Sequence, residues 1–198
     1  QSLINELIAI NQSKKNNNAV LFNEFNALNQ TKNSITNSDY IDQKRTLSKK
    51  YPQAWFTAQV LGSLAIDLSI DSENKVQNTK EIFAIQQTLS AQFPNSDEKR
   101  AIDDLVKRIK SKDFKITAEE YIIINQNTPI GIQHKNLDKI YVRVLAYNKG
   151  FINDVDLRKL SIYNDNRVKE GQDFINSLKT IEQYTIDLKS FDDYQDHS

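Results

Sequence analysis

The longest run of regularly spaced hydrophobic residues lies between Val155 and Phe191. Its apolar members are Leu157, Leu160, Val168, Phe174, Ile175, Leu178, Ile181, Tyr184, Leu188 and Phe191. Gaps of three and four place side chains on one face of a helix, and no proline interrupts the run. About 37 residues would form a helix of roughly 55 Å, which needs packing partners along its length. We therefore expect Leu178 and Ile181, in the middle of this face, to be buried.

Residues 1–32 contain two apolar patches separated by a polar stretch. The first patch is Leu3, Ile4, Leu7 and Ile8, and the second is Leu21, Phe22, Phe25 and Leu28. The stretch 11–18 between them is rich in asparagine, a poor helix former. It is either a hinge within one helix or a loop between two shorter helices. A similar polar stretch at 164–171 would lie near it if the two terminal segments packed antiparallel.

The segment 38–150 is predicted to form the remaining helices. Ser38 or Asp39 can cap the first, and Pro52 suits the first turn of a second that runs to about Leu68. Because Leu64, Ile66, Leu68 and Ile70 alternate with more polar residues, a short strand over 64–70 is the alternative. Asn78 or Thr79 is expected to open the next helix, which Pro94 ends.

The clearest helix signal follows Ser96. Serine is a favourable N-cap, Asp97 and Glu98 match the positive end of the helix dipole, and Lys110 and Lys112 match its negative end.

Two further helices are predicted downstream of this one. Thr117 and Glu120 have the spacing of a capping box, and Asn136 is expected to cap a helix that continues to Leu145. Short strands are expected, if anywhere, as one pair drawn from 64–70, 114–116 or 130–132.

Composition supports a mainly α fold. The chain has only 4 glycines and 3 prolines in 198 residues, whereas sheet-rich folds use both in their many turns. We predict an irregular multi-helix bundle forming a single domain over residues 1–198. The terminal helices 1–32 and 153–191 pack together in this prediction and bracket the middle region 38–150.

Charge and cysteine content exclude several classes of function. The 26 basic and 26 acidic residues balance, which argues against binding to nucleic acid through bulk electrostatics. The absence of cysteine excludes disulfides and thiolate chemistry, and no apolar run is long enough to span a membrane. The chain also lacks methionine. The chain is then either an excised segment of a longer protein or a mature form that has lost a signal peptide or membrane anchor, and on the second interpretation we expect an extracytoplasmic protein, periplasmic or on the cell surface.

Two groups of residues are candidates for binding. The aromatic cluster Tyr40, Tyr51, Trp55 and Phe56 is a candidate ligand or partner site, because aromatic side chains offer large contact areas at little entropic cost. The basic group Lys107, Arg108, Lys110, Lys112 and Lys115 is a candidate site for an anion or an acidic partner. Each also has a structural interpretation, as core and as dipole matching respectively.

No residue pattern predicts catalysis. His134 has no partner that the sequence identifies and is expected to be an ordinary surface residue. No ligand spacing predicts a metal site, and no cofactor is expected. The sequence thus favours a non-catalytic binding module, a sensor or scaffold with a protein partner. An inhibitor or immunity-type protein that blocks an enzyme is the alternative, and a carboxylate-based enzyme is the third.

Overall fold

A computed structural model of the chain describes residues 2–118, 129–145, 173, 176–189, 191 and 193–198. The chain groups into two compact units. The first comprises Gln1–Asn136 with Phe191–Ser198, and the second comprises Leu137–Ser190. The expectation of a single domain stays a prediction.

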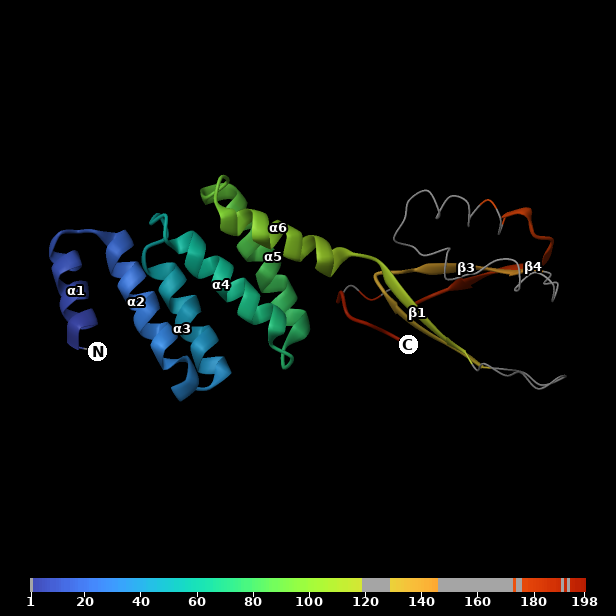
Figure 1. The fold of residues 1–198 in the computed structure, drawn as a ribbon, viewed down its shortest axis with the longest axis horizontal. Helices are drawn as coiled ribbons and strands as arrows, with labels where there is room; N and C mark the ends of the chain where they lie inside the picture. The colour runs from blue at the N-terminus through green and yellow to red at the C-terminus, as the bar shows by residue number, and fades with distance from the viewer. Residues whose placement is uncertain (1, 119–128, 146–172, 174–175, 190, 192) are drawn as a thin grey trace. The chain divides into compact units, whose positions relative to one another are not determined.

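The first unit contains six α-helices that follow one another along the chain (Figure 1). They are α1 (Ser2–Ser13), α2 (Asn17–Thr31), α3 (Asn37–Lys50), α4 (Thr57–Ile70), α5 (Lys75–Gln92) and α6 (Asp97–Lys110), with a 3₁₀ turn η1 (Lys32–Ser34) after α2. Each helix packs against the next, and α4 also contacts α6. About 60% of the described structure is helical, which confirms the mainly α prediction.

Side-chain caps set where several helices begin. The side-chain oxygens of Asn16, Thr36 and Ser96 accept hydrogen bonds from backbone amides three residues later, at 3.2, 3.1 and 3.1 Å. The cap at Ser96 was predicted, whereas Thr36 takes the place expected of Ser38 or Asp39. Residues 1–32 form two helices, and Lys15 between them has a positive φ of 55°. The loop interpretation of this stretch is therefore confirmed.

Two hydrophobic clusters hold the helices together. The larger draws on α3, α4, α5 and α6, with Leu64, Leu68, Ile82, Leu89 and Ile102 almost fully buried. The smaller joins α2, α3, the turn before α4 and α4 itself through Leu21, Phe25, Tyr40, Phe56 and Val60. Both clusters include α3 and α4, and α4 also packs against α5 and α6, so it is central to the packing of the first unit. Within the part of the chain that the structure describes, no helix is long and apolar enough to cross a membrane.

A two-stranded antiparallel sheet follows α6 in the same unit. Strand β1 (Asp113–Ala118) pairs with β2 (Ile130–Lys135), with Ile116 opposite Ile132. Of the three segments from which one strand pair was expected, 114–116 and 130–132 pair with each other, whereas a strand over 64–70 is wrong because α4 extends to Ile70. Thr117 lies within β1, so it does not begin the predicted helix, whose later residues lie outside the described ones.

The second unit corrects two helix predictions. Residues 139–145 form β3 (Lys139–Leu145), and residues 180–187 form β4 (Thr180–Asp187), which pair antiparallel. The expected helix over 137–145 is therefore wrong, and so is the long C-terminal helix over 180–187. Ile181 is 61% exposed instead of buried. Residues 180–187 therefore supply no helix for the predicted packing of the terminal helices, and the polar stretch 164–171 lies outside the described residues.

The cross-strand pairs of β3 and β4 explain why these segments form strands. In the second unit, Ile140 and Val142 lie opposite Ile186 and Tyr184, which places four β-favouring side chains on one face. Strand pairing also gives the two segments hydrogen bonds to each other along their facing edges. This long-range pairing prevails over the helical spacing of their apolar residues.

Candidate functional site

The four aromatic residues of the candidate ligand or partner site have different environments. Tyr40 and Phe56 are each 3% exposed and belong to the smaller core cluster, and Tyr51 packs against the same cluster. Trp55, in contrast, is 66% exposed. The core interpretation therefore holds for three members of the cluster, and Trp55 alone presents most of its side chain to a ligand or partner.

Hydrogen bonds fix the turn that carries Trp55. The Thr57 hydroxyl donates to the Tyr51 carbonyl at 2.7 Å, and the Thr57 amide donates to the Ala54 carbonyl at 2.9 Å. The Phe56 amide donates to the side-chain oxygen of Asn18 on α2 at 3.2 Å. Hydrogen bonds thus hold the backbone on both sides of Trp55. One of them is accepted by Asn18, in the asparagine-rich stretch.

Aromatic packing explains why Trp55 faces outward. Phe56 contacts Phe22 and Phe25 edge-to-face, with ring centroids 5.4 and 5.9 Å apart. Because Phe56 takes the inward position, its neighbour Trp55 lies on the outer side of the turn. The Trp55 ring still packs edge-to-face on Phe56 at 5.6 Å. An anchored ring with an exposed face is typical of side chains that dominate protein interfaces.

A pocket of about 380 Å³ lies beside this tryptophan, and we call it the Trp55 pocket. It is lined by Trp55, Ala58, Gln59, Phe93, Pro94, Asn95, Ser96, Asp97 and Glu98. These residues come from the start of α4 and from the turn between α5 and α6. Pro94 restricts the backbone of that turn, and Ser96 caps the helix that follows it. This wall of the pocket therefore has a locally fixed backbone conformation.

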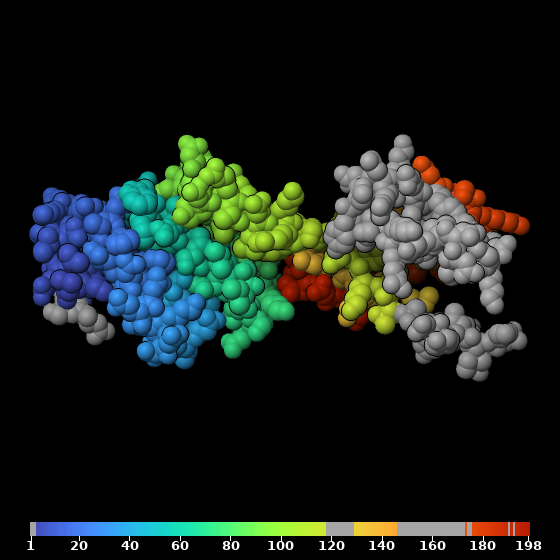
Figure 2. All heavy atoms as spheres, in the orientation of Figure 1, coloured from blue at the N-terminus to red at the C-terminus, as the bar shows by residue number. Residues whose placement is uncertain are grey.

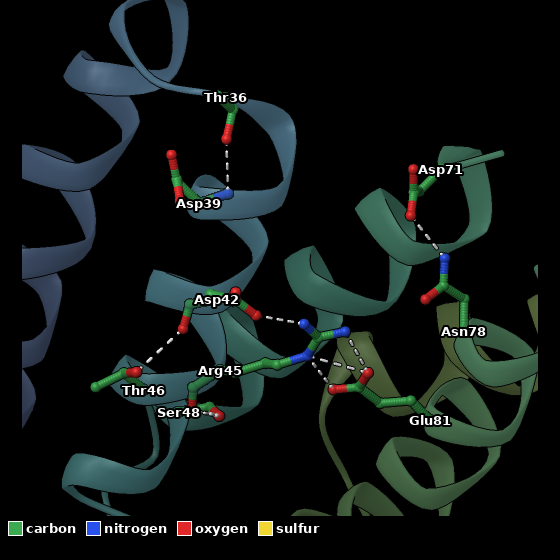
Figure 3. A network of polar contacts seen from close by, with 9 residues as sticks. All are labelled: Thr36, Asp39, Asp42, Arg45, Thr46, Ser48, Asp71, Asn78 and Glu81. Atoms are coloured by element: carbon green, nitrogen blue, oxygen red, sulfur yellow. Dashed lines mark hydrogen bonds and ion pairs between the residues drawn. The ribbon is translucent and has the colours of Figure 1, made fainter. Parts of the chain in front are cut away.

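A second depression lies along α3, α4 and α5, and we call it the α3–α5 groove. It encloses about 360 Å³ and includes Leu61, Leu64 and Ile85 together with the charged residues Arg45 and Glu81. The Arg45 guanidinium binds Glu81 through two nitrogens and donates to Asp42 at 2.5 Å, as Figure 3 shows. The hydrogen bond that Arg45 donates to Glu81 raises the pKa of the guanidinium above its usual value. Because these charges satisfy one another, the groove is best described as a structural link between α3 and α5.

A buried lysine forms another polar link between helices. Lys44 on α3 is 1% exposed, donates to Ser63 Oγ at 2.7 Å and forms an ion pair with Asp67 on α4. Its ammonium also lies 4.4 Å from the centroid of the Tyr40 ring. This paired charge orients α3 on α4, and the sequence gives no local signal for it.

The five basic residues of the candidate anion site are exposed, but they do not share one environment. Lys107, Arg108 and Lys110 lie in the last turn of α6, where they match the helix dipole. The Lys110 ammonium lies 4.8 Å from the Phe83 ring, Lys112 follows the helix and Lys115 lies in β1. None of the five forms an ion pair within the described chain. A role in anion binding stays a prediction.

His134 is a residue that sequence reasoning placed wrongly. Instead of lying on the surface it is 7% exposed, in β2 opposite Phe114. Its Nδ1 atom is buried and has no hydrogen-bond partner. Among the described residues, no three histidine or carboxylate side chains are arranged to hold a metal ion.

Comparisons with known proteins were made at three levels. No family model matches the chain, no curated protein matches it, and no solved structure matches it. A functional proposal therefore depends on the geometry of the Trp55 pocket itself.

Proposed function

We propose that the chain is a non-catalytic interaction module that binds a segment of a partner protein at the Trp55 pocket. The observation that carries this proposal is the exposure of Trp55, at 66%, in a turn whose backbone is fixed by hydrogen bonds. Tryptophan is the side chain most enriched among residues that dominate binding energy. Exposing it in a rigid position costs solvation free energy that a partner recovers.

The free energy available at this position is large. Two thirds of a tryptophan side chain is on the order of 100–150 Å² of mostly apolar surface. At roughly 25 cal/mol per Å², covering it would contribute about 2.5–4 kcal/mol before the entropic costs of association are subtracted. Because the turn is already ordered, little of that free energy would be spent on fixing Trp55 in place.

An inhibitor that blocks an enzyme is the second candidate, favoured by the same rigidity. A side chain that protrudes from a fixed turn fits a partner cleft without an ordering cost, as tight inhibitors require. The two candidates share the binding surface and differ in the partner. Inhibition of a captured enzyme by the wild-type chain, lost in Trp55→Ala, would select the inhibitor.

The experiment uses the fact that Trp55 is the only tryptophan in the chain. Peptides are selected on the intact protein from a displayed random library, and their binding is followed by Trp55 fluorescence and by calorimetry. We expect a blue shift of the emission on binding. We also expect Trp55→Ala to weaken binding by at least about 2 kcal/mol, as for a dominant interface residue.

The matched control is Tyr141→Ala, which removes a 74% exposed aromatic residue from the second unit. It should leave peptide affinity unchanged. Peptides that bind Trp55→Ala as tightly as the wild type would show that the interaction surface lies elsewhere and would overturn the proposal.

A further inference from the structure

The charges around the Trp55 pocket are of one sign. Asp97 and Glu98 both line it, whereas the described lining includes no lysine or arginine. Asp97 forms an ion pair with Arg100. The Glu98 side chain forms no ion pair or hydrogen bond within the described chain. The pocket therefore combines an exposed indole with one unpaired carboxylate.

Packing holds the stem of Glu98 in place against α4. A Cβ atom added at Gly62 would lie 3.0 Å from Glu98 Cγ and 3.1 Å from Glu98 Cβ, so the two helices approach closely at this glycine. Ala58 and Gly62 lie four residues apart on α4, and Ala58, Trp55 and Glu98 all line the pocket. The stem of Glu98 is thus held against α4 at Gly62, and its side chain lines the same pocket as the Trp55 ring.

The local backbone does not make this pocket an anion site. The Ser96 hydroxyl already caps the start of α6 by accepting from the Lys99 amide at 3.1 Å. Lys99 itself is paired with Asp103 at 2.5 Å. The two carboxylates at the first positions of α6 offset the positive end of the helix dipole and would repel a second anion.

We propose that the Trp55 pocket receives a cationic side chain, a lysine or arginine of the partner segment, between the Trp55 indole and the Glu98 carboxylate. Tryptophan is the best aromatic acceptor of a cation, and a carboxylate adds a charge-assisted hydrogen bond. Arginine is favoured over lysine, because a planar guanidinium stacks on the indole and binds a carboxylate through two nitrogens. This inference rests on the proposed function and specifies the chemistry of its partner.

The test uses three small probes on the intact protein: the N-acetyl methylamides of arginine, lysine and citrulline. Citrulline keeps the shape of arginine without its charge. Binding is followed by Trp55 fluorescence and by the NMR shift of the indole Nε1–H. We expect saturable binding of the arginine probe, several-fold weaker binding of the lysine probe and no saturation with citrulline.

Two carboxylate variants identify the group that holds the cation. Glu98→Gln keeps the side-chain volume and should weaken the arginine probe about five-fold or more. Asp104→Asn removes an equal charge from an exposed position on the same helix, outside the pocket lining, and should change nothing. Equal binding of arginine and citrulline, an absence of saturable arginine binding, or full affinity in Glu98→Gln would each overturn the inference.

The outcome is distinguishable from that of the proposed function. Selected peptides that require Trp55 but carry no cationic residue would leave the interaction module in place and overturn the cation site. Arginine binding that depends on Glu98, together with peptides that ignore Trp55, would support the cation site and overturn the interaction module.

Discussion

His134 and His197, the only two histidines in the chain, are joined by reciprocal backbone hydrogen bonds of 2.8 Å. Their ring centroids lie 6.0 Å apart. This bridge returns the C-terminal residues to β2, and the Tyr194 ring packs edge-to-face on Phe83 of α5 at 5.1 Å. Figure 2 shows the red atoms of this tail beside the green and yellow-green atoms of α6 and β1. The tail therefore closes the first unit by contacts with residues far away in sequence.

The tail is expected to lose stability in acid. His197 Nε2 lies 2.9 Å from Asp193 Oδ1, and this hydrogen bond lowers the pKa of Asp193. A carboxyl whose pKa is lower in the folded state contributes stability above its unfolded pKa of about 3.9. That contribution is lost as the pH falls through the folded pKa. Asp193→Asn should therefore speed hydrogen exchange of the tail at pH 7 and make no difference at a pH below the folded pKa.

The control for this prediction is Asp196→Asn, a carboxyl in the same tail whose side chain has no hydrogen bond or ion pair with the described residues. It should leave exchange at neutral pH unchanged. Titration of the Asp193 carboxyl carbon by NMR measures the pKa directly. A value at or above that of a model peptide would contradict the stabilising hydrogen bond.

Much of the helical part could be predicted from sequence because its signals are local. The Ser96 cap, the acidic residues after it and the stop at Pro94 all act within a few residues of the helix ends that they determine. The strands of the second unit depend instead on a partner segment far along the chain. In β3 the residues Ile140, Tyr141 and Val144 have helical spacing, yet Ile140, Val142 and Val144 also alternate. Only the pairing with β4 decides between the two patterns.

The candidate site could be predicted only in part, because long-range packing also decides which of its residues are exposed. Composition singles out the aromatic cluster, but adjacent aromatics such as Trp55 and Phe56 are equivalent until the packing of α2 is known. Phe22 and Phe25 on α2 favour the inward position of Phe56, and this leaves Trp55 outside. The Glu98 contact is also a long-range effect, because it requires α6 to cross α4 at Gly62.

The core of the first unit should be sensitive to truncation at α4. Leu64 is 2% exposed within the larger cluster, so Leu64→Ala removes buried methyl groups and leaves a cavity. We expect a loss of about 2–5 kcal/mol in the free energy of unfolding, measured by urea denaturation. Ile70→Ala, at a 75% exposed position on the same helix, should cost less than about 0.5 kcal/mol. Equal effects of the two substitutions would show that α4 is not the centre of the packing.

Asp67 is expected to matter more than a surface carboxylate because it neutralises a buried lysine. Asp67→Ala would leave the Lys44 ammonium, 1% exposed, without a counter-charge. Uncompensated buried charge costs about 3–5 kcal/mol, and urea denaturation measures it. Asp67 also lies 3.7 Å from Lys32, whose side chain is 55% exposed, so Lys32→Ala should cost less than about 1 kcal/mol. A loss below about 1 kcal/mol for Asp67→Ala would mean that Lys44 is not held by this pair.

Glycine at position 62 should be required by the approach of α6 rather than by backbone conformation. Gly62 lies within α4, where replacement by alanine would ordinarily stabilise a helix by about 1 kcal/mol. The added Cβ would lie 3.0 and 3.1 Å from Glu98 Cγ and Cβ, and the Cβ atom is bonded directly to the α6 backbone. Relief therefore requires the start of α6 to move. We expect Gly62→Ala to be no more stable than the wild type and to change the Trp55 emission.

Gly131→Ala provides the comparison for that substitution. Its Cβ would lie 3.7 Å from the Thr117 carbonyl oxygen, an ordinary contact, and its φ is not positive. By restricting the unfolded chain it should stabilise the protein by about 0.4–1 kcal/mol and leave the Trp55 emission unchanged. Urea denaturation and fluorescence of the two variants together test the close approach. If Gly62→Ala stabilises as much as Gly131→Ala, then α6 yields easily at Glu98, and the carboxylate is not held beside Trp55 by packing.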